Sequence, residues 1–146
     1  PNTPEERGQL LSWLMFVASG VGPYSGQSVH FQAYAPEKAP YAVNRYRYEA
    51  HRHYAILDDR LKFRPYVLGD AYTIVDMAAW GWARLIPRIL DDATWDGLPN
   101  LKRLVDEIDA RPATERALAL MANSKFKTKM DAESHRNMFP SNAKPT

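Results

Sequence analysis

The chain has 146 residues, of which 45% are hydrophobic and 25% charged, a balance typical of one folded domain and not of a disordered segment. It contains no cysteine, which excludes a disulfide scaffold and catalysis by a thiol of its own. The net charge of +2 comes from the tail after residue 122, so the body is near neutral and we do not expect nucleic acid as a partner.

The first predicted helix has a complete start signal. Thr3 can cap it, Pro4 suits its first turn, and Glu6 can return a hydrogen bond to the cap. It should run to about Ser19, and residues 10–18 are apolar in nearly every direction around its axis. Such a helix needs cover on several sides, so we expect a homodimer.

Residues 20–36 are uncharged and rich in glycine, which predicts a long loop. Aromatic and neutral polar side chains within it suit the wall of a pocket for an organic ligand. The longest stretch without Asp, Glu, Lys or Arg runs from Gly8 to Pro36 and includes this segment. Polar residues, glycine and proline interrupt it too often for a membrane span.

The second predicted helix begins between Glu37 and Pro40 and continues to about Lys62. Along it, apolar side chains recur three or four residues apart, which is the spacing of one helix face. This face should pack in the core and consists of Val43, Tyr46, Ala50, Tyr54, Leu57 and Leu61.

Arg45, Glu49 and Arg52 lie on another face of this helix, and two interpretations of Arg45 follow. Glu49 comes four residues later, the spacing of an ion pair on a helix surface. A planar guanidinium also suits bidentate binding of a ligand carboxylate, and the uncharged segment before the helix favours that possibility. These residues alone leave both interpretations open.

Thr73 and Asp76 have the residue types and spacing of a capping box, which predicts the start of a third helix. We expect this box to serve folding and not ligand binding. Pro87 should kink or end the helix, because it lacks a backbone N–H and crowds the carbonyl four residues earlier.

Two shorter helices are predicted at 99–110 and 112–122. Their inward side chains should be Leu101, Leu104, Val105 and Ile108 in the first, and Ala117, Leu118 and Leu120 in the second. From Asn123 we expect an irregular basic tail. The sequence therefore predicts an all-α bundle of about five helices, with a domain at 1–122 and a tail at 123–146.

The histidines are not spaced for a metal site. His51 and His53 are two positions apart, so on a helix their side chains point about 200° apart. His30 and His135 have no carboxylate or histidine at ligand spacing. The sequence also lacks a phosphate loop, a nucleophile elbow and a dinucleotide motif, so we expect no metal and none of these sites.

Several motifs are nevertheless familiar. The run at 66–80, YVLGDAYTIVDMAAW, resembles the capped core helix in the C-terminal domain of glutathione transferases. Upstream, Gly22-Pro23, His30-Phe31, YAPEK at 34–38 and YAVNRY at 41–46 are similar to the bacterial nu-class branch, the glutathione-dependent disulfide-bond oxidoreductases. The resemblance covers residues 5–139.

The resemblance implies a cytoplasmic enzyme that uses glutathione as co-substrate and acts on a small disulfide or electrophile. Members of this family carry a thioredoxin-like N-terminal domain with most glutathione contacts, and that domain is missing from this chain. By the same resemblance, no catalytic residue lies here and the chain alone is inactive. Arg45 would bind a glutathione carboxylate, and Ser19 and Tyr24 would line the second-substrate pocket. The alternative is a stand-alone all-α module that binds other proteins without catalysis.

Overall fold

The computed structural model describes residues 2–124, 127 and 130–140. Within these residues the chain is helical and has no β-strand, only an isolated bridge between Tyr66 and Gly69. The elements are α1 (Pro4–Phe16), a π-helical turn η1 (Val17–Val21), α2 (Gly22–Val29), a second π-helical turn η2 (His30–Tyr34), α3 (Pro40–Leu61), α4 (Ile74–Ala83), α5 (Ile86–Ile89), a 3-10 turn η3 (Asp92–Gly97), α6 (Pro99–Asp109), α7 (Pro112–Ala122) and α8 (Ala132–Met138). The all-α prediction is confirmed, although the described chain has eight α-helices and not about five.

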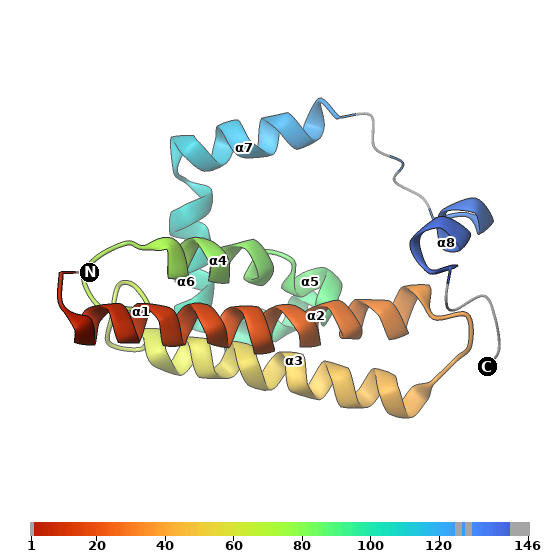
Figure 1. Cartoon of the computed structure of the whole chain (residues 1–146), viewed down its shortest axis with the longest axis horizontal. Helices are drawn as coiled ribbons and strands as arrows, with labels where there is room; N and C mark the ends of the chain where they lie inside the picture. The colour runs from red at the N-terminus through yellow and green to blue at the C-terminus, as the bar shows by residue number, and fades with distance from the viewer. Residues whose placement is uncertain (1, 125–126, 128–129, 141–146) are drawn as a thin grey trace.

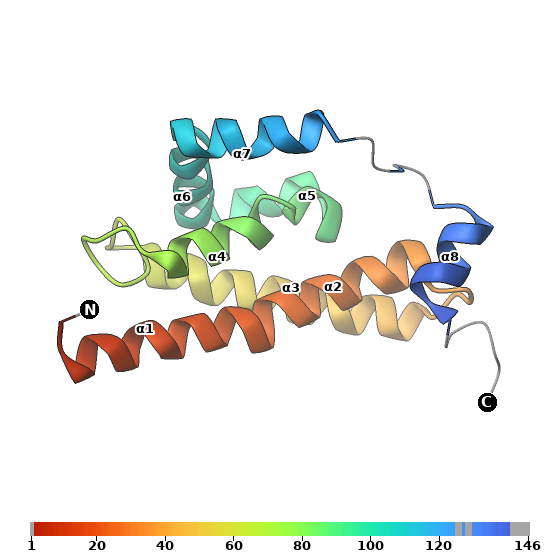
Figure 2. The ribbon, with the colours of Figure 1, turned by 45° about the horizontal axis from the view of Figure 1, so that its top comes forward.

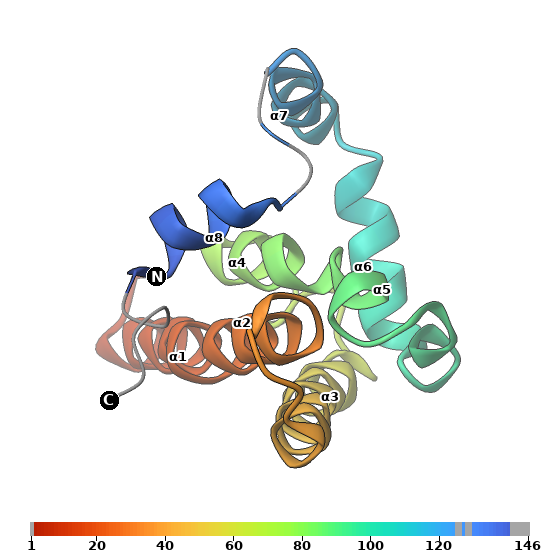
Figure 3. The ribbon, with the colours of Figure 1, turned by 90° about the vertical axis from the view of Figure 1, so that its right-hand side faces the viewer.

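The helices pack around a core between α3, α4 and α6. In Figure 1, α1 and α2 form one long rod that runs antiparallel beside α3, and Figure 2 shows the same pairing after rotation. The end view in Figure 3 shows α4 beside the α1–α2 rod on one side and beside α6 on the other. The largest fully buried side chains include Tyr54, Leu57 and Leu61 of α3, Val75 of α4, and Leu101, Leu104 and Ile108 of α6.

The predicted loop at 20–36 is wrong, because the chain stays helical as far as Tyr34. The turn η1 has the wider π pattern, in which the Gly22 N–H donates to the Val17 carbonyl. A π turn just before Pro23 relieves the clash that its ring would make inside a regular α-helix. Gly22 serves packing, because an ideal Cβ on it would lie 3.1 Å from the Trp82 ring.

Part of this segment is buried, and its buried polar positions carry no charge. Ser25 and Ser28 are completely buried, and the Ser25 hydroxyl shares a 2.7 Å hydrogen bond with the Tyr54 hydroxyl of α3. Burial raises the pKa of Tyr54, while this hydrogen bond acts in the opposite direction. A charged side chain in these positions would lose its hydration without a partner.

The helix α3 agrees with its prediction in both position and packing. It begins at Pro40 and ends at Leu61. Four of the six residues of the predicted face are buried, while Val43 and Tyr46 near the N-terminal end are half-buried. The charged face differs from the prediction, since Glu49 is buried with 5% of its surface exposed.

The start of α4 is held by Thr73 and Asp76. The Thr73 hydroxyl accepts a 3.2 Å hydrogen bond from the Val75 N–H, and the Asp76 carboxylate accepts one of 2.8 Å from the Thr73 N–H. Asp76 is completely buried, and its other oxygen accepts a 2.8 Å bond from the Val67 N–H. One carboxylate therefore caps the helix and also fixes the loop before it.

The later helices agree with prediction as far as α6. Pro87 lies in the first turn of the short α5, which begins after α4 has ended, and the four predicted inward residues of α6 are all buried. The prediction for α7 is wrong: Ala117 and Leu120 are exposed and Leu118 is only half-buried. These side chains are not buried because α7 turns away from the core after α6, as Figures 1 and 3 show.

The predicted irregular tail is also wrong in part. Asp131 caps α8 by accepting a 2.9 Å hydrogen bond from the Ser134 N–H. Lys127 Nζ lies 2.6 Å from the second carboxylate oxygen of Asp131, so the capping residue also forms an ion pair. The remaining tail residues, 125–126, 128–129 and 141–146, lie outside the described residues.

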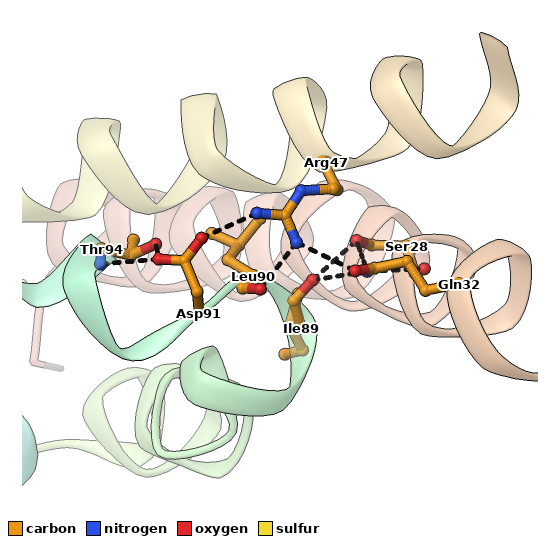
Figure 4. Close-up of polar contacts among 7 residues, drawn as sticks. All are labelled: Ser28, Gln32, Arg47, Ile89, Leu90, Asp91 and Thr94. Atoms are coloured by element: carbon orange, nitrogen blue, oxygen red, sulfur yellow. Dashed lines mark hydrogen bonds and ion pairs between the residues drawn. The ribbon is translucent and has the colours of Figure 1, made fainter. Parts of the chain in front are cut away.

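A polar cluster ties the end of α5 to the α2–α3 pair (Figure 4). The Arg47 guanidinium of α3 donates to the Leu90 carbonyl at 2.6 Å and to the Asp91 carboxylate at 2.8 Å. The Gln32 amide donates to the Ile89 carbonyl at 2.9 Å. These contacts satisfy carbonyls that the four-residue helix α5 leaves unpaired at its end.

Candidate functional site

Arg45 lies on the solvent side of α3, where it forms a three-residue ionic cluster. Its Nη1 is 2.6 Å from one carboxylate oxygen of Glu49, and Arg52 Nη2 is 2.9 Å from the other. The Glu49 side chain is only 7% exposed, whereas those of Arg45 and Arg52 are about half exposed. One buried carboxylate thus orients two guanidinium groups at the surface.

The charge of Glu49 is stabilised by its surroundings. The side-chain hydrogen bond from Arg52 lowers the pKa of Glu49 most, and the nearby Arg45 charge lowers it further, against the effect of desolvation. Glu49 therefore stays ionised at pH values below the range in which a carboxyl group usually takes up its proton. Arg45 uses one of its several N–H donors in this pair, and the exposed part of the guanidinium can meet a ligand carboxylate.

A row of rings runs along the seam between the α1–α2 rod and α3. The His53 ring lies 4.9 Å from that of Tyr24 and 5.3 Å from that of Phe16, and its Nδ1 is 2.7 Å from the Glu49 carbonyl oxygen. Tyr46 continues the row, with its ring centroid 6.3 Å from Tyr24. Gly20 makes room for this row, since any Cβ there would meet the His53 ring.

A cavity of about 420 Å³ opens on a different side, between α2, η2, α4 and α5. Its apolar walls include Val29, Trp82 and Leu85, and Phe139 closes it from the C-terminal segment. The volume falls within the range that small-molecule sites occupy. A second cavity of about 510 Å³ adjoins it, shares Tyr34 and Phe139, and is lined in part by α8.

The structure does not bring all the predicted site residues together. Tyr24 packs in the ring row beside Tyr46, the residue next to Arg45, while Ser19 is exposed and donates a 2.6 Å hydrogen bond to the Met15 carbonyl. Neither Ser19 nor Tyr24 is among the residues that line the two cavities. Thr73 and Asp76 serve the fold, as described above.

Sequence reasoning predicted a pocket wall within residues 20–36, and Gln27 and His30 of that segment do line the cavity, but the residues from the other elements were missed. Trp82 and Leu85 had no distinguishing feature beyond an apolar side chain, and Arg88 was one exposed cation among many. Phe139 comes from the tail that was predicted to be irregular. The one available signal was the aromatic content of residues 24–34, which did point to a pocket in this region.

Two further findings concern the residues that the structure describes. No three histidine, aspartate or glutamate side chains among them are grouped so that they could hold a metal ion. None of their helices combines the length and apolar character needed to cross a membrane.

Comparison with known proteins places this geometry in context. Residues 40–107, from the start of α3 to near the end of α6, match the family model described as glutathione S-transferase, C-terminal domain. Among curated proteins, the disulfide-bond oxidoreductase YfcG of Escherichia coli is 39% identical over 113 residues, covering 77% of this chain and 52% of that protein. The disulfide-bond oxidoreductase YghU of the same organism is 34% identical, covering 80% and 42%.

Solved structures agree with these matches. The glutathione transferase URE2P6 of Phanerochaete chrysosporium, in complex with oxidised glutathione, superposes with a TM-score of 0.78 at 31% identity, covering 84% of this chain and 56% of that one. A family member from Pseudomonas fluorescens with two glutathione bound gives 0.75 at 32% identity, covering 81% and 54%. The chain spans about half the length of the curated relatives it matches.

Proposed function

The chain contains a C-terminal domain of the glutathione S-transferase family, and we propose that it forms the α-helical half of a glutathione-dependent enzyme that reduces small disulfides. The observation that carries this proposal is the match over α3 to α6, a region that includes Arg45 and the ionic cluster around it. Two relatives that are named disulfide-bond oxidoreductases support the choice of disulfide reduction as the reaction.

The proposed reaction uses the thiol of glutathione as nucleophile, because the chain has no cysteine. A glutathione thiolate attacks one sulfur of the substrate disulfide, a mixed disulfide forms, and the other sulfur leaves as a thiolate that takes up a proton. A second glutathione thiolate then attacks the mixed disulfide. The substrate is reduced to two thiols, and two glutathione molecules are oxidised to one glutathione disulfide.

Within this reaction, this chain would position substrates. Arg45 is proposed to bind a carboxylate of glutathione, since its guanidinium is half exposed and is held in place by the buried Glu49. The group that activates the glutathione thiol would lie outside this chain. On this proposal the chain alone is inactive, and the enzyme works in the cytoplasm, where glutathione is kept reduced.

The second substrate needs a separate pocket. The cavity of about 420 Å³ offers the required volume and apolar walls, and it is the better supported position. Tyr24 and Ser19 remain a prediction for this role, with Tyr24 half-buried in the ring row and Ser19 exposed.

Replacing Arg45 by alanine in the polypeptide encoded by the gene should weaken glutathione binding by roughly 10- to 100-fold, the loss typical of a charge-assisted hydrogen bond. Arg52→Ala is the matched control, because Arg52 contacts the same Glu49 and has a similar exposure. Isothermal titration calorimetry of wild type and both variants checks this. Equal glutathione affinity in wild type and Arg45→Ala would show that Arg45 is only a surface ion-pair residue.

We also propose that the protein is a homodimer. Met15 is 60% exposed and Leu11 is 49% exposed on α1, and Tyr41 and Tyr48 of α3 are exposed as well. Leu11 and Met15 lie one helical turn apart on α1, and exposed apolar groups that are neighbours on a surface favour an interface. Light scattering at tens of micromolar should give twice the chain mass, and a clean monomer would contradict the proposal.

The alternative, a stand-alone interaction module without catalysis, is not favoured. Its only support is an apolar helical surface, whereas the relatives that match this chain are named for enzymatic activity. An encoded polypeptide with dimer formation but no glutathione binding would restore this alternative.

A further inference from the structure

The residues that line the 420 Å³ cavity indicate which kind of ligand it can bind. Its walls combine flat aromatic and aliphatic groups, with Trp82 and Phe139 providing the two largest apolar surfaces. An aromatic or aliphatic group of a ligand that enters this cavity would remove apolar area from water. The apolar and aromatic lining therefore favours an aromatic ligand over an extended polar one.

The charged side chains that line the two cavities are both arginines, Arg88 in this one and Arg136 in its neighbour. In the described part of the chain, the ionisable groups lining this cavity and its 510 Å³ neighbour are His30, Arg88, His135, Arg136 and the shared hydroxyl of Tyr34, with no aspartate or glutamate among them. A cleft lined by one sign of charge with apolar walls concentrates the opposite charge. The lining therefore favours an anion.

Arg88 is the cation best placed to bind that anion. It lies in the last turn of α5, its guanidinium hydrogen-bonds the Tyr34 hydroxyl, and it stands 5.8 Å from the centre of the Tyr34 ring. No aspartate or glutamate of the described residues forms an ion pair with it. Its charge is held in position by a neutral partner and is not cancelled by an acid.

The backbone that follows Arg88 is also held in place. The next three residues, Ile89 to Asp91, are anchored by Gln32 and Arg47, which bind their carbonyls and the Asp91 carboxylate (Figure 4). A ligand-binding side chain on a rigid element loses less conformational entropy when it binds. The end of α5 is such an element.

We propose that this cavity binds a small aromatic molecule that carries a carboxylate or another anionic group, with the ring against the apolar walls and the anion on Arg88. Only its identification as the second substrate rests on the proposed function. The binding itself requires no glutathione, and it can be measured on this chain.

The test compares two probes with the same ring and different charge, 1-naphthoate and the neutral 1-naphthylmethanol. Calorimetry on this chain should show naphthoate binding at least about tenfold more tightly, as expected for a charge-assisted contact. Arg88→Gln should remove this preference and leave the affinity for naphthylmethanol nearly unchanged. Phe139→Ala should weaken both probes, because it removes a shared apolar wall.

The matched control is Arg84→Gln. Arg84 lies four residues earlier, over the Trp80 ring, and does not line the cavity, so its loss should not change the preference for the anion. Thermal melts of all three variants show whether each remains folded. Equal affinity of the wild-type chain for both probes would overturn the inference, as would a preference that Arg84→Gln abolishes and Arg88→Gln retains.

The outcomes also separate this inference from the proposed function. Glutathione-dependent disulfide reduction without any preference of the cavity for anions would overturn the inference alone. Charge-selective binding of naphthoate by this chain, with no glutathione activity in the encoded polypeptide, would support the inference and contradict the proposed function.

Discussion

Replacing Asp76 by alanine is expected to lower the free energy of unfolding by about 3 kcal/mol. The carboxylate is completely buried and accepts hydrogen bonds from the backbone N–H groups of Val67 and Thr73, each at 2.8 Å. Alanine would leave the buried Val67 donor without an acceptor, at a cost of roughly 1–3 kcal/mol, and the part-buried Thr73 donor would add a smaller cost. Denaturant unfolding followed by circular dichroism measures the change.

Two variants serve as controls for this prediction. Asp76→Asn keeps one acceptor oxygen and the shape of the side chain, so its effect should be intermediate. Asp70→Ala removes an exposed carboxylate from the same loop and should change the stability by less than about 0.5 kcal/mol. An unfolding midpoint of Asp76→Ala equal to that of Asp70→Ala would contradict the role assigned to Asp76.

The second large effect is expected at Gly20, where alanine should destabilise the protein by about 1–3 kcal/mol, the range for overpacking. An ideal Cβ at this position would lie 2.6 Å from two atoms of the His53 ring. The ring cannot move aside freely, because it is buried, stacks on Phe16 and is bound to the Glu49 carbonyl.

Gly26→Ala is the matched control, since both glycines lie in the same helical rod. An added Cβ on Gly26 meets no described atom within 4 Å, and alanine favours a helix over glycine by roughly 0.5–1 kcal/mol. We expect Gly26→Ala to raise the melting temperature and Gly20→Ala to lower it. Shifts of the same sign in both variants would show that helix propensity, and not contact with His53, decides the outcome.

Asp76 and Gly20 show how much of the structure could be predicted from the sequence alone. The capping box at Thr73 was readable because both partners lie within one turn, so local spacing determines their contact. The bond from Val67 to Asp76 joins a loop to a helix, and no spacing rule predicts it. The prediction from sequence therefore found the cap and missed its larger structural role.

Gly20 illustrates the opposite error. The glycines and the lack of charge in residues 20–36 predicted a long loop, because glycine is common where a helix is interrupted. Here the glycines allow His53 and Trp82 to approach the helix, and a π turn accommodates Pro23. Such close approach depends on the partner helix, which the local sequence does not contain.

The candidate site shows the same limit. Arg45 could be found from its helix face and its neighbours, and the ion pair with Glu49 could be predicted from four-residue spacing. The burial of Glu49 depends on tertiary packing and could not be predicted from spacing. The cavity forms only where α2, α4, α5 and the C-terminal segment meet. In α7, apolar spacing indicated an inward face, but the direction of the helix after Arg111 placed that face outside the core.

The central claim, that this chain is the helical half of a glutathione-dependent disulfide reductase, is tested most directly by turnover. The polypeptide encoded by the gene should reduce 2-hydroxyethyl disulfide at a rate that saturates with glutathione, and Arg45→Ala should raise the half-saturating glutathione concentration by roughly tenfold or more, whereas Arg52→Ala should not. A rate equal to the uncatalysed reaction at every glutathione concentration would contradict the claim.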